Sequence, residues 1–162
     1  MPNSWEYVRL GEVIYLLSGR DLAPSQYNAV SNGIPYITGA SNFSINNLII
    51  NRWTTEPVVI SHYGDLLITC KGTIGTISYN MIGDVHIARQ VMAINSKHIY
   101  LPYIKMFLLS YIDTLQSKAK SMIPGISRDD LCAAIIPIPP YSEQIKISKY
   151  ISKIFDTIKG EN

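Results

Sequence analysis

Cysteine is scarce in this chain of 162 residues. Only Cys70 and Cys132 occur, and neither belongs to a Cys-x-x-Cys pair. A disulfide framework and a zinc site of ordinary spacing are therefore excluded. Long apolar runs are also absent: none approaches the roughly 18 residues of a membrane span, and residues 1–19 lack the basic head and apolar run of a signal peptide. We expect a soluble, cytoplasmic protein without a membrane partner.

Charge is also sparse. Charged residues make up 16% of the chain, 47% is hydrophobic, and the net charge is +2. This is typical of a well-packed globular chain and does not by itself indicate nucleic-acid binding. Residues 1–70 sum to −2 (three basic, five acidic), 71–140 to +3 (seven and four) and 141–162 to +1 (four and three), so an anionic partner would bind the middle stretch. The length fits one domain, which we place at 1–140, with a helix at 141–162.

The motifs of common enzymes are missing. The chain has no phosphate-binding loop and no Gly-x-Ser-x-Gly nucleophile elbow, and its three histidines show no metal-site spacing. Ile138-Pro139-Pro140-Tyr141 is similar to the Asn/Asp-Pro-Pro-Tyr motif of amino-methyltransferases, but isoleucine cannot accept the hydrogen bond from the target amine. We therefore predict a protein that is not an enzyme and that needs no cofactor and no metal.

Turn residues and short β-branched runs predict a first half rich in strands. Gly64-Asp65 and Gly72–Gly75 read as tight turns that border strands at Leu66–Thr69 and Thr76–Tyr79. Asp84–Asn95 reads as a further strand pair. Less regular features are a short opening segment at Trp5–Leu17 with a helical start at Leu10–Ile14, a loop at Arg20–Gly33, a strand at Ile34–Thr38, and β-branched runs at Leu48–Ile50 and Val58–Ile60.

The second half is predicted to be largely helical, which makes the fold class α+β. Pro102 suits the first turn of a helix whose apolar residues recur at helical spacing. Ser127 is a candidate N-cap, and Ala133–Ile138 is a final strand. The pair Pro139-Pro140 should mark the hinge before a last helix at Ser142–Lys159, which projects from the domain or packs at its edge.

An apolar stripe runs along this last helix. The stripe is only about two heptads long, too short for a free-standing coiled coil. It either packs on the domain's own core, meets a partner, or begins a longer element. Because a large exposed apolar stripe usually marks an interface, we predict a subunit interface formed by Ile147, Tyr150, Ile151, Ile154, Phe155 and Ile158.

The segment from Lys71 to Gly75 permits two interpretations. A Gly-x-x-Gly turn beside a lysine can present backbone amides to a phosphate, as in KH domains. The same residues also form an ordinary turn between two strands, and such short matches are often accidental. Taken alone, the segment favours the turn.

An ordered series of motifs spans nearly the whole chain. It includes Leu10-Gly11-Glu12, Gly33–Ile37, Gly64–Ile68, Gly72–Gly75, Ala88 with Gln90, Leu101 with Tyr103, Ile126-Ser127, and Ile136-Pro137-Ile138-Pro139-Pro140 before Glu143-Gln144. This series resembles a target-recognition domain of the specificity subunit of type I restriction–modification enzymes. Each motif alone is weak, and the Pro-Ile-Pro-Pro-x-x-Glu-Gln run before a helix is the most specific.

The resemblance implies a non-catalytic role in DNA recognition. Subunits of this family usually carry two such domains, each reading one half of a split DNA site, and their long helices pair antiparallel. Methyltransferase subunits, which bind S-adenosylmethionine, and an ATP-driven restriction subunit complete the complex. This chain has one domain and a short closing helix, and Tyr141 stands where the family commonly has leucine. It is either a half-subunit, which would pair with a second copy of itself, or one domain of a longer protein.

We therefore expect sequence-specific binding of double-stranded DNA through polar and basic loop residues. The candidates are Arg20, Ser41, Asn42, Lys71, Thr73, Arg89, Lys118, Lys120 and Arg128. The alternative from another class is an assembly domain that binds no DNA and uses the helix stripe, which the weak net charge favours slightly. An enzyme with its own methyl-transfer or nuclease activity is disfavoured by the missing motifs.

Overall fold

The computed structural model describes residues 5–45, 47–118 and 125–160, and it confirms the α+β class. The strands are β1 (Glu6–Arg9), β2 (Tyr15–Ser18), β3 (Ile34–Ile37), β4 (Trp53–Thr54), β5 (Ile60–Ser61), β6 (Leu66–Thr69), β7 (Ile77–Tyr79), β8 (Val85–Ile87), β9 (Val91–Asn95) and β10 (Ile135–Ile138). The α-helices are α1 (Leu101–Lys118), α2 (Arg128–Ala133) and α3 (Tyr141–Gly160), and short 3-10 turns occur at Leu10–Glu12, Pro24–Gln26 and Ala40–Asn42.

A central antiparallel sheet in the order β2-β9-β6-β7 separates two hydrophobic cores. Successive side chains of a strand point to opposite faces, so Leu66 and Ile68 of β6 pack with Ile104 of α1, whereas Leu67 packs with Ala93 in the second core. Every residue of β6 is consequently buried. The predicted hairpin of Leu66–Thr69 with Thr76–Tyr79 is confirmed, since β6 and β7 pair antiparallel.

A distal sheet in the order β4-β3-β8-β5 packs on the second core. The predicted strands within Asp84–Asn95 both form, but they do not pair with each other. β8 runs parallel to β3 in the distal sheet, whereas β9 pairs with β2 and β6 in the central sheet. The turn at 88–90, closed by the Val91 amide donating to the Ala88 carbonyl at 3.0 Å, carries the chain from one sheet to the other.

The prediction for the opening segment is partly wrong. Only Leu10–Glu12 is helical, as a 3-10 turn, and it lies between two strands, β1 and β2. β1 pairs with β10 and β2 with β9, and both partners lie far along the chain. Two β-branched runs are also mostly irregular: Leu48 forms an isolated bridge with Phe43, and Val58–Ile60 contributes only Ile60 to a strand.

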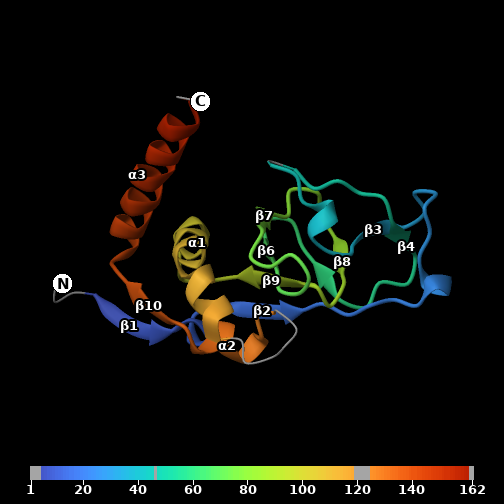
Figure 1. Cartoon of the computed structure of the whole chain (residues 1–162), viewed down its shortest axis with the longest axis horizontal. Helices are drawn as coiled ribbons and strands as arrows, with labels where there is room; N and C mark the ends of the chain where they lie inside the picture. Colours follow the sequence, from blue (N-terminus) through green and yellow to red (C-terminus); the bar gives the residue numbers. More distant parts are fainter. Residues whose placement is uncertain (1–4, 46, 119–124, 161–162) are drawn as a thin grey trace.

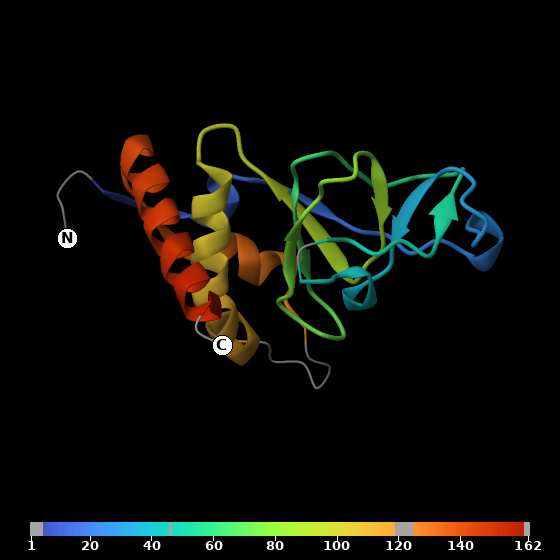
Figure 2. The same cartoon turned by 90° about the horizontal axis from the view of Figure 1, so that it is seen from above.

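The helical half forms as predicted. Ser127 caps α2, with its hydroxyl oxygen accepting from the Asp130 amide at 3.0 Å. β10 ends at Ile138 and α3 begins at Tyr141, so Pro139-Pro140 separates them. α3 lies beside α1 and rises away from the body (Figures 1 and 2), at the opposite end of the long axis from β3 and β4. Within the described residues, no helix is long and apolar enough to cross a lipid bilayer.

Candidate nucleic-acid interface

A polar hollow of about 470 Å³ opens beside the distal sheet. Four segments that are distant in sequence line it: the loop after β2, the end of β3 with the following 3-10 turn, the residues before β4, and the turn between β8 and β9. Its lining includes Tyr27, Thr38, Ser41, Arg52 and Gln90. The hollow therefore collects hydroxyl, amide and guanidinium groups. Strands β3 and β4, whose neighbouring residues contribute to its lining, lie at the opposite end of the molecule from α3 (Figure 1).

The loop that forms one wall of the hollow is anchored by backbone hydrogen bonds. The Gly19 amide donates to the Val91 carbonyl at 3.1 Å, and the Arg20 amide donates to the Ile87 carbonyl at 2.9 Å. Gly19 lies so close to the chain that a Cβ atom there would approach the Ala88 carbonyl oxygen to 1.8 Å. The loop position is thus set by its contact with the sheet.

A buried histidine joins this wall to the distal sheet. Nε2 of His86 lies 2.7 Å from the Arg20 carbonyl oxygen, and Nδ1 lies 3.1 Å from the amides of Val58 and Val59. Since a carbonyl only accepts and an amide only donates, the ring is neutral with its proton on Nε2. Burial lowers the pKa of His86 below its ordinary value, which keeps this form populated.

Tyrosines complete the wall. Tyr36, whose ring meets His86 edge-on at a centroid distance of 5.1 Å, accepts a hydrogen bond from the Leu22 amide at 3.1 Å through its hydroxyl oxygen. The ring of Tyr27 lies 5.4 Å from that of Tyr36. Burial raises the pKa of Tyr36, so its hydroxyl stays neutral. These contacts make the wall of the hollow a packed structure.

Three basic residues belong to the segments that line the hollow. Residues 1–90 contain five, Arg9, Arg20, Arg52, Lys71 and Arg89; Arg52 is in the lining, and Arg20 and Arg89 are next to lining residues in the chain. Lys71 follows Cys70, whose amide donates to the Gln90 carbonyl at 2.8 Å. All five are exposed. Of the predicted set, Arg20 and Arg89 thus lie beside lining residues of the hollow, whereas Lys71 lies in the turn between β6 and β7, bridged to Gly125; Arg52, which was not among the predicted residues, lines the hollow itself.

One carboxylate lines the hollow, and it is neutralised. Asp21 accepts from Nε of Arg89 at 3.0 Å and from the Arg89 backbone amide at 3.1 Å. Both groups are partly exposed, so the pair adds little to stability. The ion pair joins the loop after β2 to the turn between β8 and β9 and offsets the negative charge that would repel an anionic ligand.

Asn42, which was predicted to contact DNA, has a structural role in the fold. Asn42 is fully buried, and its side-chain oxygen accepts from the amides of Thr38 and Gly39 at 2.8 and 3.2 Å. Its side-chain nitrogen donates to the Ile49 carbonyl at 2.8 Å. Asn42 therefore shapes the loop after β3, whereas its neighbour Ser41 is exposed in the hollow.

Lys71 and Thr73 lie at an exposed turn, as both interpretations of this segment require. Gly72 and Gly75 have φ values of 74° and 84°, a region that favours glycine. The Gly75 amide donates to the Thr69 carbonyl at 2.8 Å, and the Thr76 amide donates to the Thr69 hydroxyl at 2.9 Å. The geometry supports a connecting turn between β6 and β7, with the Lys71 side chain in solvent.

The other candidate basic residues are not part of this cluster. Arg128 lies at the start of α2, where it donates to the Ser18 hydroxyl at 2.9 Å. Lys118 is the last residue of α1, and its side chain lies outside the described part of the chain, as does the whole of Lys120.

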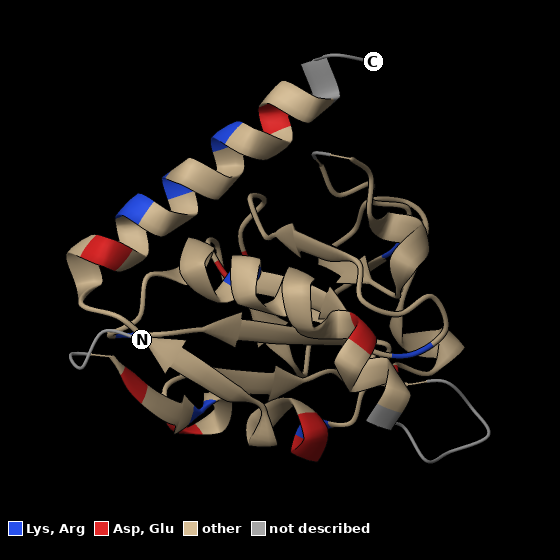
Figure 3. Cartoon of the chain, turned by 60° about the vertical axis from the view of Figure 1, so that its left-hand side comes forward, with Lys and Arg blue, Asp and Glu red and all other residues tan. Residues whose placement is uncertain are grey.

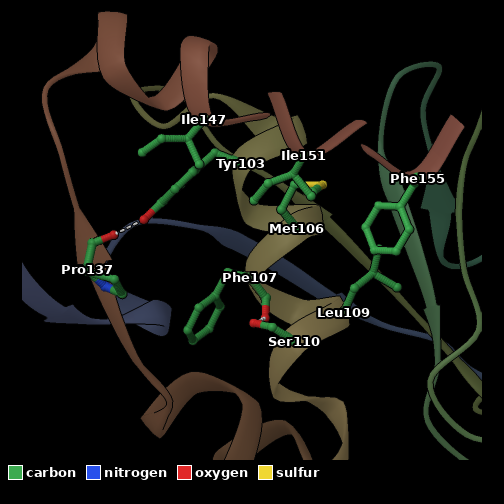
Figure 4. A pocket seen from close by; sticks show the side chains of 9 residues that line it. All are labelled: Tyr103, Met106, Phe107, Leu109, Ser110, Pro137, Ile147, Ile151 and Phe155. Atoms are coloured by element: carbon green, nitrogen blue, oxygen red, sulfur yellow. Dashed lines mark hydrogen bonds between the residues drawn. The ribbon is translucent and has the colours of Figure 1, made fainter. Parts of the chain in front are cut away.

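The predicted interface stripe on α3 divides into two parts. Ile147, Ile151 and Phe155 line an apolar groove of about 340 Å³ together with Tyr103 and Met106 of α1 (Figure 4). The other residues, Tyr150, Ile154 and Ile158, are exposed, and Phe155 is also half exposed at 49%. The lysines Lys146, Lys149 and Lys153 are exposed on the same helix (Figure 3). One side of the stripe, with Ile147, Ile151 and Phe155, therefore faces the domain's own α1, whereas Tyr150, Ile154 and Ile158 meet solvent.

Comparisons with known proteins identify the class. The family "Type I restriction modification DNA specificity domain" matches residues 2–162, so the chain belongs to this family. The "Putative type I restriction enzyme MjaX specificity subunit" of Methanocaldococcus jannaschii is 26% identical over 168 residues, which cover 98% of this chain and 38% of that protein. The chain thus spans less than half of this relative.

Solved structures agree in fold. The HsdS subunit of Thermoanaerobacter tengcongensis superimposes with a TM-score of 0.86 at 26% identity, covering 99% of this chain and 39% of that one. A chain from a study of type I restriction–modification complex assembly also gives 0.86 at 26% identity, with 99% and 40% covered. The specificity subunit of M. genitalium, at 15% identity and a TM-score of 0.68, shares the fold. The predicted resemblance is confirmed.

Proposed function

We propose that this chain is a non-catalytic specificity component that reads one half of a split duplex DNA site for a type I restriction–modification complex. Membership of the DNA specificity domain family and the match to named specificity subunits support this role. Within the described residues, no group of three or more histidine, cysteine or acidic side chains is arranged to hold a metal ion. The chain supplies recognition, and other subunits supply methyl transfer and cleavage.

The observation that carries the proposal is the polar hollow with basic residues in the segments that line it. Arg52 lines the hollow, Arg20 precedes the lining residue Asp21, and Arg89 lies between the lining residues Ala88 and Gln90. Lysine and arginine side chains that gather on one surface neutralise DNA phosphates and release counterions. Ser41 in the hollow and Thr73 in the turn between β6 and β7 are also exposed, and both are available to base edges or phosphates.

Assembly is assigned to α3. We propose that the outer residues of the helix, Tyr150, Ile154, Phe155 and Ile158, pack against a DNA-methyltransferase subunit or a second copy of this chain, and that the restriction subunit joins through the complex. Two copies related by a twofold axis would place identical domains on an inverted-repeat split site. Ile147 and Ile151 support this surface from the groove against α1.

A second candidate function is assembly alone, without DNA contact. The exposed apolar residues of α3 favour it, because such a surface marks an interface whatever the distal end does. If the chain served assembly alone, its distal end would show no affinity for duplex DNA, whereas the main proposal requires such affinity.

The test is selection from a pool of random duplexes by the purified chain, followed by titration at several salt concentrations. A DNA specificity domain should enrich a short motif and bind more weakly as salt rises, since each phosphate contact contributes to the slope. Absence of any salt-dependent binding would favour the assembly candidate. Binding without motif enrichment would show a DNA-binding protein that does not itself choose the site.

A further inference from the structure

Gln90 offers an unpaired amide group in the polar hollow. Its backbone is fixed, because its carbonyl accepts from the Cys70 amide at 2.8 Å and the turn that carries it is closed by Val91 and Ala88. Its half-buried side chain makes no hydrogen bond with any other described residue. Gln144, in contrast, uses both ends of its side-chain amide within the fold. The Gln90 side chain thus lines the hollow from a fixed backbone, with the donor and acceptor of its amide available to a ligand.

Arg52 offers a guanidinium in the same hollow. Its backbone carbonyl accepts from the Tyr36 amide at 2.8 Å, which holds the residue beside β3. The guanidinium donates to the Asn51 carbonyl at 2.9 Å and forms no ion pair with a described carboxylate. Since a guanidinium carries five N–H donors, most of its donors remain for an anion.

The concave shape of the hollow indicates whether it would contact the sugar–phosphate backbone or the base edges of a duplex. In double-stranded DNA the sugar–phosphate strands form ridges, and the base edges lie recessed in the grooves between them. A concave protein surface fits a ridge, whereas base edges are reached by side chains that protrude into a groove. Hydroxyl, amide and guanidinium groups are also the side-chain donors that bind phosphate oxygens. The lining of the hollow, with Ser41, Arg52 and Gln90, has this composition.

We propose that the hollow seats the sugar–phosphate backbone of one DNA strand, with Arg52 and Gln90 donating to a phosphate and thereby setting the register of the domain on the duplex. This inference rests on the proposed DNA-binding function and assigns positioning, not base reading, to these two residues. Base contacts then fall to side chains on the rim. Asp21 does not oppose the seat, because Arg89 neutralises it.

The test compares the duplex affinity of Arg52→Ala and Gln90→Leu with that of the unmodified chain. The duplex carries the motif that the unmodified chain enriches, and a mixed-sequence duplex is used if no motif is enriched. Arg52→Ala should weaken binding about tenfold or more at low salt and reduce the slope of log affinity against log salt by about 0.9. Gln90→Leu removes a neutral donor, so it should weaken binding without changing the slope. Both losses should be equal on matched and scrambled duplexes, and an enriched motif should stay the same.

Arg9→Ala is the matched control, because Arg9 is an exposed arginine on β1 and not part of the hollow. It should leave affinity and slope unchanged, and thermal unfolding should show that all three variants are folded. A changed motif in Arg52→Ala or Gln90→Leu would overturn the phosphate seat in favour of base reading. Unchanged binding in both would overturn the seat while the DNA-binding function stands, whereas failure of the unmodified chain to bind any duplex would overturn that function itself.

Discussion

The side-chain oxygen of Gln144 accepts a hydrogen bond from the backbone amide of Tyr100 at 2.9 Å, which joins the first turn of α3 to the residue before α1. The nitrogen of the same side chain donates to the Pro139 carbonyl at 2.9 Å, and Gln144 is buried. Close by, the Trp5 indole donates to the Glu143 carboxylate at 2.9 Å. The base of α3 is therefore fastened to the domain, although its outer part lies in solvent.

Replacing Gln144 with alanine should lower the free energy of unfolding by about 2–3 kcal/mol, because the substitution leaves a partly buried amide and a buried carbonyl without partners. Urea unfolding followed by circular dichroism measures this change. Gln116→Ala, at an exposed position of α1, is the control and should change stability by less than about 0.5 kcal/mol. Equal stability of the two variants would show that α3 is not held by this contact.

Asn42→Ala should destabilise the fold by about 2–4 kcal/mol, since it removes the acceptor for two amides and the donor to the Ile49 carbonyl. The exposed neighbour provides the control, and Ser41→Ala should remain near the stability of the unmodified chain. The measurement is again urea unfolding. If Asn42→Ala kept its stability and lost DNA binding, the side chain would contact DNA after all.

His86 should make the protein less stable in mild acid. Burial lowers its pKa in the folded state below the ordinary 6.5, so the unfolded chain binds a proton more readily. This contribution to stability is present above about pH 6.5, falls as the pH drops below that value, and levels off once the pH is below the lowered pKa. Urea unfolding between about pH 5 and 8 should show this decline.

His62 affects the pH dependence of stability in the opposite direction to His86, so it should be replaced before this measurement. Its hydrogen bond to Asp84, with Nδ1 2.7 Å from the carboxylate, raises the pKa of His62. Its contribution is thus present below the ordinary pKa and is lost as the pH rises through the raised one. The His62→Gln background isolates His86, and in that background His86→Gln should flatten the dependence between pH 5.5 and 7. If stability fell by the same amount in the variant that lacks His86, the pH dependence would come from other groups.

The two parts of the α3 stripe should respond differently to charge. Ile154→Asp with Ile158→Asp places carboxylates at exposed positions, so the chain should stay folded while self-association or methyltransferase binding weakens. Ile151→Asp places a charge in the groove against α1 and should lower the melting temperature. Light scattering and thermal unfolding measure the two effects. The interface would be contradicted if the unmodified chain were monomeric at high concentration and bound no methyltransferase subunit, and if Ile154→Asp/Ile158→Asp unfolded. The whole stripe would then belong to the core.

The chain alone should not bind S-adenosylmethionine or methylate DNA. Ile138 stands where an amine-binding asparagine or aspartate would be required. Calorimetric titration with S-adenosylmethionine should give no heat beyond dilution, with a purified methyltransferase as the positive control. Micromolar binding would contradict the non-catalytic role.

Local patterns predicted much of the fold because their causes are local. Turn glycines border the β6–β7 hairpin, Ser127 caps α2, and paired prolines separate β10 from α3. The pairings of β1 with β10 and of β3 with β8 were not predicted, since their partners lie far apart in the chain and no residue pattern within either strand names the other. For the same reason, the two strands within 84–95 could not be assigned to different sheets.

The sequence by itself determined the family, the α+β class, the missing catalytic motifs and the apolar stripe of α3, because these depend on residue types and short spacings. Only the tertiary structure decided which polar residues can reach a ligand. It buried Asn42, brought Arg52 and Gln90 into one hollow from separate segments, and turned Ile151 toward α1 while Ile154 stayed exposed. Burial and convergence arise when distant segments pack together, so they cannot be recognised from the order of residues along one segment.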